Sequence, residues 1–318
     1  MTATEVKPYK PPMLRGPRKT FAELQKVNRR RSLVLAISLL LVLGVLGALV
    51  GAYFGNWLIG VAGGMALATF QFLVARSAGT KMVMAAMGAK PLERKEDPQL
   101  VNVVEEIAIA AGIPCPTIYL IEDESPNAFA TGFKPEDAQV AITTGLREKL
   151  NRAELQAVMA HEIGHIRNGD TGYMVLMAVL VGSVALISDM ALRGLRYGSY
   201  GRSSRKSKGG GGQALILVLL LVFALLAPIF SRLLQAAVSR QREYLADATS
   251  VELMREPSAL ISALQKLTMD PVSMKNANRA VQHMFIVNPF KHHKLGGNAL
   301  SSHPKLADRI ARIRNLMA

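Results

Sequence analysis

Four long apolar runs constrain the fold of this chain more than any other feature of its sequence. They cover residues 33–54, 57–74, 172–188 and 214–230. The first run contains no charged residue and is long enough to cross a bilayer as one helix, which takes about 20 apolar residues. Because only Gly55 and Asn56 separate it from the second run, the two predict a tight helical hairpin. The sequence therefore indicates a membrane-anchored protein.

The second pair of runs conflicts with the distribution of positive charge. Basic residues precede and follow the first hairpin, which places both of its ends in the cytoplasm by the positive-inside rule. If the second pair also crosses twice, its connecting loop at residues 193–212, rich in Gly, Arg and Lys, is exported against that rule. Either the first hairpin sets the topology, or the second pair is monotopic or partly buried in the domain. We favour four crossings, and hence a multi-pass protein of the plasma (inner) membrane.

The net charge of +15 raises the question of nucleic-acid binding, since clustered Lys and Arg also bind phosphates. Here the clusters flank the apolar runs, and no zinc-finger or RNA-recognition signature accompanies them. We therefore predict a lipid bilayer and no nucleic acid among the partners. The single cysteine, Cys115, excludes an intramolecular disulfide and is most simply a small buried apolar residue. The sequence makes no prediction of the oligomeric state.

A short motif, His161-Glu-Ile-Gly-His165, lies between the two hairpins. Asn151 and Glu154 form a capping-box pattern ahead of it, and apolar residues recur at helical spacing, so we expect a helix. Residues i and i+4 share one face of a helix, which allows both imidazoles to bind one metal ion. Glu162 beside them can hold and deprotonate a water that zinc polarises. This is the chemistry of the H-E-x-x-H pattern, which also arises by chance on helix surfaces.

The residues around the motif predict a small α+β domain. An amphipathic helix ends at Gly112, and strand-like stretches follow at Thr117–Ile121, 127–131 and Gln139–Thr143. We expect a small antiparallel sheet in front of the helix that carries the motif. An exposed edge of such a sheet can pair with an extended peptide. The simpler interpretation of residues 127–129 is an ordinary core strand.

A catalytic zinc ion needs a third protein ligand besides two histidines, with water in the fourth position. One source is the set of histidines near the end of the chain: His283, His292, His293 and His303. Another is the segment after the fourth apolar run, which offers Glu243 and, one helical turn later, Asp247. Glu243 would complete a His₂Glu set, and Asp247 could orient a ligand imidazole. Alternatively, both carboxylates balance Arg240 and Arg242 on a charged helix face.

These features divide the chain into five segments. Residues 1–31 form a mobile basic tail, residues 32–76 a transmembrane hairpin, and residues 77–171 the first part of a metal-binding domain. Residues 172–230 form the second apolar hairpin, and residues 231–318 complete the domain. Two further helices are expected in the last segment, from the apolar series Leu260, Leu264 and Leu267 and the series Leu306, Ile310 and Ile313. The fold class is α+β, mainly helical.

Together these motifs resemble the HtpX family of membrane-embedded zinc metalloproteases, which are relatives of the CAAX prenyl proteases. The resemblance covers nearly the whole chain from residue 33 and includes the segments 126–132, 161–170, 242–247 and 302–304. It implies a zincin-type (gluzincin) metalloprotease domain with one Zn²⁺ bound by His161, His165 and Glu243. The tail at 1–31 and the loop at 193–212 depart from a minimal member, and they bear on the topology of the second hairpin.

The resemblance also implies roles for other residues and a function. Glu162 would be the general base, and His303 would lie near the active site, where it stabilises the tetrahedral intermediate or begins a helix. The substrate-binding edge strand would consist of Asn127, Ala128, Phe129 and Ala130. The implied activity is endopeptidase cleavage of misfolded or damaged membrane proteins, in quality control and stress response, by a domain that faces the cytoplasm.

Two alternatives differ in where the zinc lies and what it does. An intramembrane zinc protease would carry its motif inside a spanning helix, but the residues that flank the motif are too polar for that. A membrane scaffold or chaperone with a structural zinc would close the site with a fourth protein ligand. Catalysis instead needs an open position and a base such as Glu162, so the enzyme is the favoured hypothesis.

Overall fold

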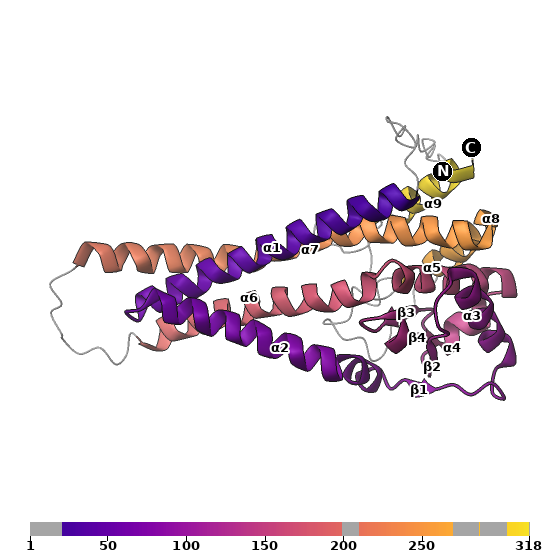
Figure 1. The fold of residues 1–318 in the computed structure, drawn as a ribbon, viewed down its shortest axis with the longest axis horizontal. Helices are drawn as coiled ribbons and strands as arrows, with labels where there is room; N and C mark the ends of the chain where they lie inside the picture. Colours follow the sequence, from indigo (N-terminus) through magenta and orange to yellow (C-terminus); the bar gives the residue numbers. More distant parts are fainter. Residues whose placement is uncertain (1–20, 199–209, 270–285, 287–303, 318) are drawn as a thin grey trace, which may run out of the picture.

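The computed structural model describes residues 21–198, 210–269, 286 and 304–317. Long helices lie side by side, and a compact domain is gathered at one end of them (Figure 1). The long helices are α1 (Phe21–Tyr53), α2 (Trp57–Ala86), α6 (Asp170–Gly198) and α7 (Gly210–Met254). Helices α1 and α2 form a hairpin, while α6 leaves the domain and α7 returns to it.

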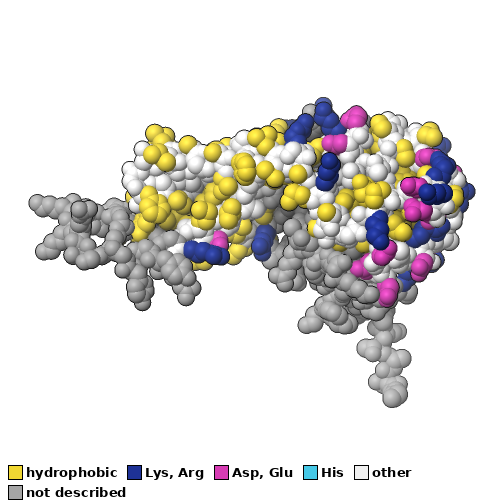
Figure 2. All heavy atoms as spheres, turned by 90° about the horizontal axis from the view of Figure 1, so that it is seen from below, with side chains coloured by type: hydrophobic (Ala, Val, Ile, Leu, Met, Phe, Trp, Pro, Cys, Tyr) yellow, Lys and Arg dark blue, Asp and Glu magenta, His cyan; other side chains and the backbone are white. Residues whose placement is uncertain are grey.

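Each long helix contains a stretch that is long and apolar enough to cross a membrane. These stretches are Arg30–Tyr53, Trp57–Ala86, Asp170–Arg193 and Ala214–Leu233. Figure 2 shows hydrophobic side chains spread over the long-helix part, whereas charged side chains gather over the domain. The chain is therefore built as a multi-pass membrane protein with a polar domain at one end of its bundle.

The domain contains a mixed four-stranded sheet, so the prediction of a purely antiparallel sheet is wrong. The strand order is β1 (Lys90–Pro91), β2 (Thr117–Ile121), β4 (Gln139–Thr143) and β3 (Ala128–Thr131). Strands β2 and β4 run parallel, while the pairs β1–β2 and β3–β4 are antiparallel. Strand β3 lies on the outer side of β4 rather than between β2 and β4. Strand β4 is therefore next to β2, which runs in the same direction.

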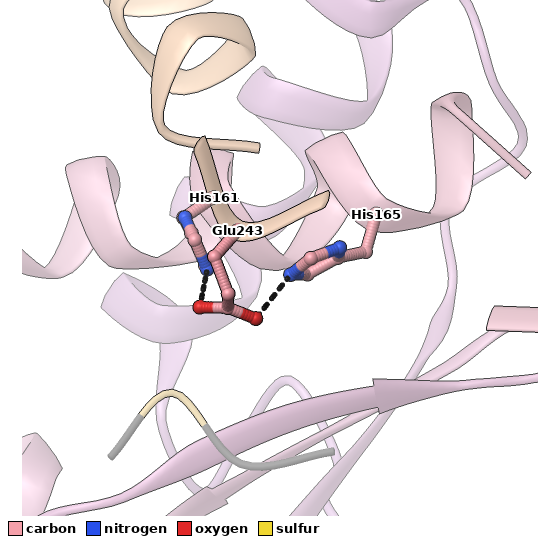
Figure 3. A group of neighbouring side chains, drawn as sticks. All are labelled: His161, His165 and Glu243. Carbon is pink, nitrogen blue, oxygen red and sulfur yellow. Dashed lines mark ion pairs between the residues drawn. The ribbon is translucent and has the colours of Figure 1, made fainter. Parts of the chain in front are cut away.

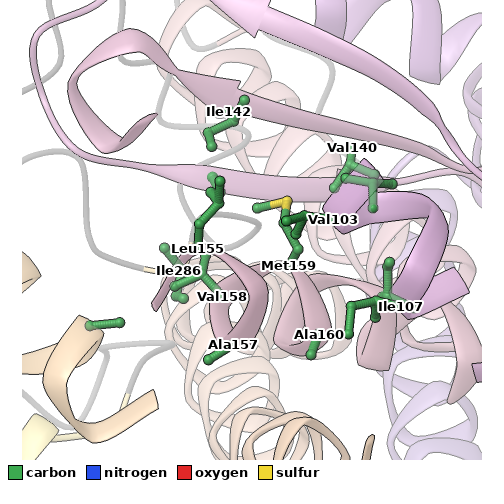
Figure 4. Packing of buried hydrophobic residues seen from close by; sticks show 14 of the residues in the cluster. Val103, Ile107, Val140, Ile142, Leu155, Ala157, Val158, Met159, Ala160 and Ile286 are labelled. Carbon is green, nitrogen blue, oxygen red and sulfur yellow. The ribbon is translucent and has the colours of Figure 1, made fainter. Parts of the chain in front are cut away.

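Helices pack on this sheet and on one another and so close the domain. They are α3 (Pro98–Ala111), α4 (Thr144–Lys149), α5 (Arg152–Arg167), α8 (Pro257–Met269) and α9 (Leu306–Met317). The main hydrophobic core joins Val103 and Ile107 of α3 to Val140 and Ile142 of β4 and to Met159 of α5 (Figure 4). Helix α5 is thereby enclosed between β3 of the sheet and the helices α3, α7 and α8.

Most of the predicted elements are present, with corrections at their ends. Helix α3 ends at Gly112, whose φ of 68° is the left-handed conformation that suits glycine, and α8 and α9 are the two predicted C-terminal helices. Helix α1 already begins at Phe21, so residues 21–31 are helical rather than part of a tail. The rest of that tail and most of the loop at 193–212 lie outside the described residues.

Two further expectations need correction. Cys115 is exposed rather than buried and lies in the link from α3 to β2. Strand β1, only two residues long, was not predicted.

Candidate metal centre and active site

Helix α5 presents both histidines of the motif on one face. It begins with the predicted capping box, in which Asn151 Oδ1 accepts a hydrogen bond from the Glu154 N–H and Glu154 Oε2 accepts one from the Asn151 N–H. His161 and His165 lie one turn apart, both are buried, and their ring centroids are 4.9 Å apart. The helix thus brings two imidazoles together inside the protein, where polar groups need partners.

Glu243 on α7 completes the cluster. Its carboxylate faces both imidazoles (Figure 3), with Oε2 3.7 Å from His161 Nε2 and Oε1 3.5 Å from His165 Nε2. Ligand atoms of the three residues all lie within 4.8 Å of one another, and all three residues are buried. The fold therefore brings together the three residues that the sequence nominated as metal ligands.

Two further carboxylates lie within hydrogen-bond distance of the Nδ1 atoms of the two imidazoles. His161 Nδ1 lies 3.0 Å from Asp247 Oδ1, and His165 Nδ1 lies 3.0 Å from Asp170 Oδ2. A carboxylate at Nδ1 holds the ring proton there and leaves the Nε2 lone pair for a metal. The sequence nominated Asp247 from its helical spacing to Glu243. Sequence reasoning missed Asp170, although its position five residues after His165 was the signal that could have found it.

Two buried arginines neutralise these carboxylates. Arg309 on α9 donates to Asp247 through Nε at 2.9 Å and Nη2 at 2.6 Å, and its Nη1 lies 3.4 Å from Glu243 Oε2. Arg242 Nη1 donates to Asp170 Oδ1 at 2.7 Å. Such pairing is needed because an unpaired buried charge is strongly destabilising. The sequence predicted neither pairing, because the partners lie 62 and 72 residues apart and no local pattern links them.

The two imidazoles differ in their affinity for protons. Burial lowers the pKa of His161 below its ordinary value of 6.5, despite the hydrogen bond with Asp247. Burial also acts to lower the pKa of His165, but the contacts with Asp170 and Glu243 outweigh it and raise that pKa to about 10. A metal ion binds the neutral imidazole, so its binding at His165 displaces a proton.

Glu162 lies beside this cluster without a strong partner of its own. It is 1 % exposed, and neither carboxylate oxygen makes a hydrogen bond of good geometry within the described part of the chain. Burial, reinforced by the charge of Glu243, raises the pKa of Glu162 to about 8 against the opposing charges of His165 and Arg309. A carboxyl group with a pKa near neutrality is suited to accept a proton and to return it.

Strand β3 lies at the edge of the sheet and packs against α5. Its register with β4 turns the backbone of Phe129 toward β4, so the N–H and C=O groups of Ala128 and Ala130 face away from β4. The Ala128 N–H donates to Asn127 Oδ1 at 3.2 Å, and the Ala128 C=O accepts from the Ile286 N–H at 3.0 Å. All four residues of β3 are buried, which agrees with the simpler interpretation of a core strand. The chain itself covers this strand.

Comparisons with known proteins agree with this geometry. Residues 94–317 match the model of Peptidase family M48. The chain belongs to peptidase family M48. A Protease HtpX homolog of Thermoanaerobacter pseudethanolicus is 41% identical over 303 residues, which are 94% of this chain and 99% of that protein. A Protease HtpX homolog of Listeria monocytogenes is 41% identical over 296 residues, 91% and 97% of the two chains.

A solved structure shares its fold with most of the chain. The crystal structure of S. mikatae Ste24p matches with a TM-score of 0.53 at 22% sequence identity, over 92% of this chain and 67% of that chain. At this identity the match concerns the fold alone. With the curated relatives, it confirms the predicted resemblance to the HtpX family and the metalloprotease fold.

The donor set of this M48 chain fits a zinc ion. Tetrahedral zinc with Zn–N and Zn–O bonds of about 2.0–2.1 Å places neighbouring donors roughly 3.4 Å apart. The observed separations between the imidazole nitrogens and the Glu243 carboxylate are 3.5 and 3.7 Å. His161 Nε2 is buried yet makes no hydrogen bond with the described residues. Among the described residues, the donor group consists of these three side chains.

The remaining nominated histidines lie outside the described residues: His283, His292, His293 and His303. The role of His303 near the active site therefore stays a prediction.

Proposed function

We propose that this M48 chain is a zinc-dependent endopeptidase that cleaves misfolded or damaged membrane proteins at the cytoplasmic surface of the plasma (inner) membrane. One observation carries the proposal: the donors of His161, His165 and Glu243 converge beside the buried, weakly partnered carboxyl group of Glu162. The printed names of the relatives, which are proteases, support a peptidase.

In this proposal the residues of the chain divide the chemistry among them. His161, His165 and Glu243 hold one Zn²⁺, which when bound polarises the scissile carbonyl and the attacking water and favours the ionised form of Glu162. Asp247 and Asp170 fix the ring tautomers. Glu162 accepts a proton from the water as it attacks the carbonyl, and returns the proton to the leaving nitrogen as the C–N bond breaks. No covalent bond to the enzyme forms.

The substrate would pair as an extended strand with β3, through the residues Asn127, Ala128, Phe129 and Ala130. Main-chain hydrogen bonds to a sheet edge give affinity without demanding one sequence, which suits a protease of damaged proteins. The Ile286 N–H already uses the Ala128 carbonyl, and all four residues of β3 are buried. Pairing along the strand therefore requires Ile286 to give way.

The relation of the site to the membrane supports cleavage just outside the bilayer. His165 precedes the apolar stretch of α6 by five residues, and Glu243 follows Leu233, the last residue of the apolar stretch of α7, by ten residues or roughly 15 Å of helix. Helix α5, which carries the motif, is not one of the candidate spans. This disfavours an intramembrane protease. Basic residues at the domain end of α1 and α2 favour a cytoplasmic domain.

Zinc content and casein cleavage, measured side by side, test the proposal. Wild type, Glu162→Gln and the matched control Glu148→Gln, whose side chain is exposed on α4, should each bind one zinc. Cleavage by Glu162→Gln should fall by about 10²- to 10⁴-fold, the usual contribution of a general base, while Glu148→Gln stays active. Full activity in Glu162→Gln would refute the mechanism. Zinc binding without cleavage in all three proteins would favour the alternative of a zinc-stabilised scaffold or chaperone.

A further inference from the structure

A continuous path of polar contacts joins α1, the first membrane helix, to His165 in the metal site. We infer that Arg242 and Ser32 are positioning residues: Ser32 on α1 holds Arg242, Arg242 fixes Asp170, and Asp170 orients the imidazole of His165. The seating of α1 against α6 and α7 is then a condition for a well-formed metal centre. The inference rests on the proposed function in one respect, namely that His165 is a metal ligand.

Ser32 ties α1 to both helices of the second hairpin at one point. It is only 5 % exposed. Its Oγ accepts a hydrogen bond from Arg242 Nη2 of α7 at 2.7 Å, and its backbone carbonyl accepts one from the Tyr173 hydroxyl of α6 at 3.2 Å. Ser32 is thus a buried polar side chain whose hydroxyl holds Arg242 in place.

Arg242 carries this contact to the metal site. Its Nη1 donates to Asp170 twice, to Oδ1 at 2.7 Å and to the backbone carbonyl at 3.1 Å, and its guanidinium carbon lies 3.6 Å from the centroid of the Tyr173 ring. Asp170 uses its other oxygen, Oδ2, for His165 Nδ1. Because each carboxylate oxygen has a different partner, Asp170 cannot rotate without losing one of the two contacts.

Charge pairing alone does not account for the contact with Ser32. The Arg242–Asp170 pair already satisfies both buried charges. The guanidinium is held by the two Nη1 bonds to Asp170, by stacking on Tyr173 and by the Nη2 bond to Ser32, while Nε makes no hydrogen bond within the described part of the chain. Removing the Ser32 hydroxyl takes away the Nη2 contact, so the guanidinium can shift on the Tyr173 ring, and Asp170 and His165 shift with it.

The first experiment compares full-length variants in detergent by zinc affinity, through competition with a chelator, and by the visible spectrum of the Co²⁺-substituted protein. Ser32→Ala should weaken zinc binding roughly 3- to 10-fold, below the 10- to 100-fold typical of a direct partner of a ligand, and should change the Co²⁺ spectrum. Ser32→Thr keeps the hydroxyl and should restore both. Ser38→Ala is the matched control, because Ser38 Oγ bonds to the Val34 carbonyl of its own helix.

A double-mutant cycle then tests whether Ser32 acts through Asp170. In an Asp170→Asn background, Ser32→Ala should cause no further loss of zinc affinity, since the path is already cut. If Asp170→Asn does not fold, Arg242→Lys serves as the background. The inference is overturned if Ser32→Ala leaves the zinc affinity unchanged, whether or not the Tm of the metal-free protein falls. It is also overturned if Ser32→Ala lowers the zinc affinity equally in the wild-type and Asp170→Asn backgrounds.

These measurements do not depend on cleavage, so the two proposals fail separately. A wild type that binds zinc as described but cleaves nothing refutes the endopeptidase and leaves the path from Ser32 to His165 standing. A wild type that binds no metal ion refutes both.

Discussion

Arg309 balances the negative charge of the site from a single buried position. It pairs with Asp247, contacts Glu243, and is 2 % exposed. Arg309→Met should lower the free energy of unfolding by roughly 3–5 kcal/mol, because it leaves buried carboxylates without their cation. It should also weaken zinc binding, since Asp247 is freed to turn away from His161. Urea denaturation and chelator competition measure the two effects.

The control for this prediction lies on the same helix. Arg314 is exposed near the end of α9, so Arg314→Met removes the same charge from solvent and should change neither measurement. Equal stability of Arg309→Met and Arg314→Met would show that the buried network needs no arginine.

Glu154, at the start of α5, predicts a dependence of stability on pH. Burial acts to raise the pKa of this carboxyl, but hydrogen bonds from Lys266, Ser262 and the Asn151 N–H outweigh it and hold the pKa below the ordinary value of 4.5. A pKa that is lower in the folded state stabilises the protein above pH 4.5, and this stabilisation is lost as the pH falls through the folded value.

The measurement is the Tm of metal-free wild type and Glu154→Gln as the pH is lowered. The variant should melt lower than wild type at about pH 6, and the difference should shrink as the pH falls below 4.5 through the folded pKa, where wild-type Glu154 becomes protonated as well. A difference in Tm that does not change with pH would contradict the prediction and assign the effect of the substitution to packing.

Local patterns predict the parts of the site whose members share one helix. His161 and His165 are found from their spacing of four residues, and Asp247 from the same spacing to Glu243. The choice of Glu243 over the C-terminal histidines depends on α7 packing against α5, which spacing does not reveal. Arg309 reaches the site only because α9 packs there in the folded domain. The sequence around Arg309 therefore does not predict its contact with Asp247.

At the scale of elements, the first hairpin packs through glycine. A Cβ on Gly60 would lie 2.1 Å from the Gly47 carbonyl oxygen and 2.6 Å from Gly51 Cα, so α1 and α2 would have to separate. Gly60→Ala should therefore destabilise the hairpin by roughly 1–3 kcal/mol, the usual cost of overpacking. Thermal melting followed by the fluorescence of Trp57, the single tryptophan, which begins α2, reports on this hairpin.

Gly63 on the same helix is the control. No atom lies within 4 Å of a Cβ placed there, so Gly63→Ala should be neutral or slightly stabilising, because alanine favours helix more than glycine does. If both substitutions behave alike, the contact of the two backbones does not hold the hairpin.

The order of the strands in the sheet could not be predicted from sequence patterns. Strand-like stretches between turn-rich segments located β2 and β4 at their observed bounds. The choice of neighbouring strand is made by packing, and β3 pairs on the outer side of β4. Strand β1 contains Pro91 and only two residues, too few for any alternation. The segment that covers the edge of β3 could not be predicted, because Ile286, which bonds to Ala128, comes from far along the chain.

At the scale of the whole molecule, one helix joins the membrane to the site. Helix α7 has 45 residues, about 68 Å at a rise of 1.5 Å per residue, or more than twice the hydrocarbon thickness of roughly 30 Å. It carries both an apolar stretch and Glu243, while α6 begins at Asp170 and runs outward. The domain can therefore be interrupted by a hairpin of some sixty residues and still form its site, since the hairpin returns the chain to the place where it left.

The topology of this arrangement is measurable through Cys115, the single cysteine, which is exposed in the domain. Phe54 is 74% exposed at the turn between α1 and α2, at the far end of the bundle (Figure 1). If the domain is cytoplasmic, a membrane-impermeant maleimide added to intact spheroplasts should leave Cys115 unlabelled. It should label Phe54→Cys in a Cys115→Ser background. Labelling of Cys115 from outside would place the domain on the other side of the membrane.

Ala214→Cys in the same background decides the path of the second hairpin. Ala214 begins the apolar stretch of α7 and is exposed, so four crossings predict that it is labelled from outside, as Phe54→Cys is. Protection of Ala214→Cys would mean that the second pair of helices does not cross, in accord with the positive charge of the loop that joins them.

Partial burial raises the pKa of the Cys115 thiol and slows its reaction with maleimide. Permeabilised spheroplasts at the same pH therefore provide the reference for Cys115, because protection counts as topology only if the thiol reacts once the membrane is open.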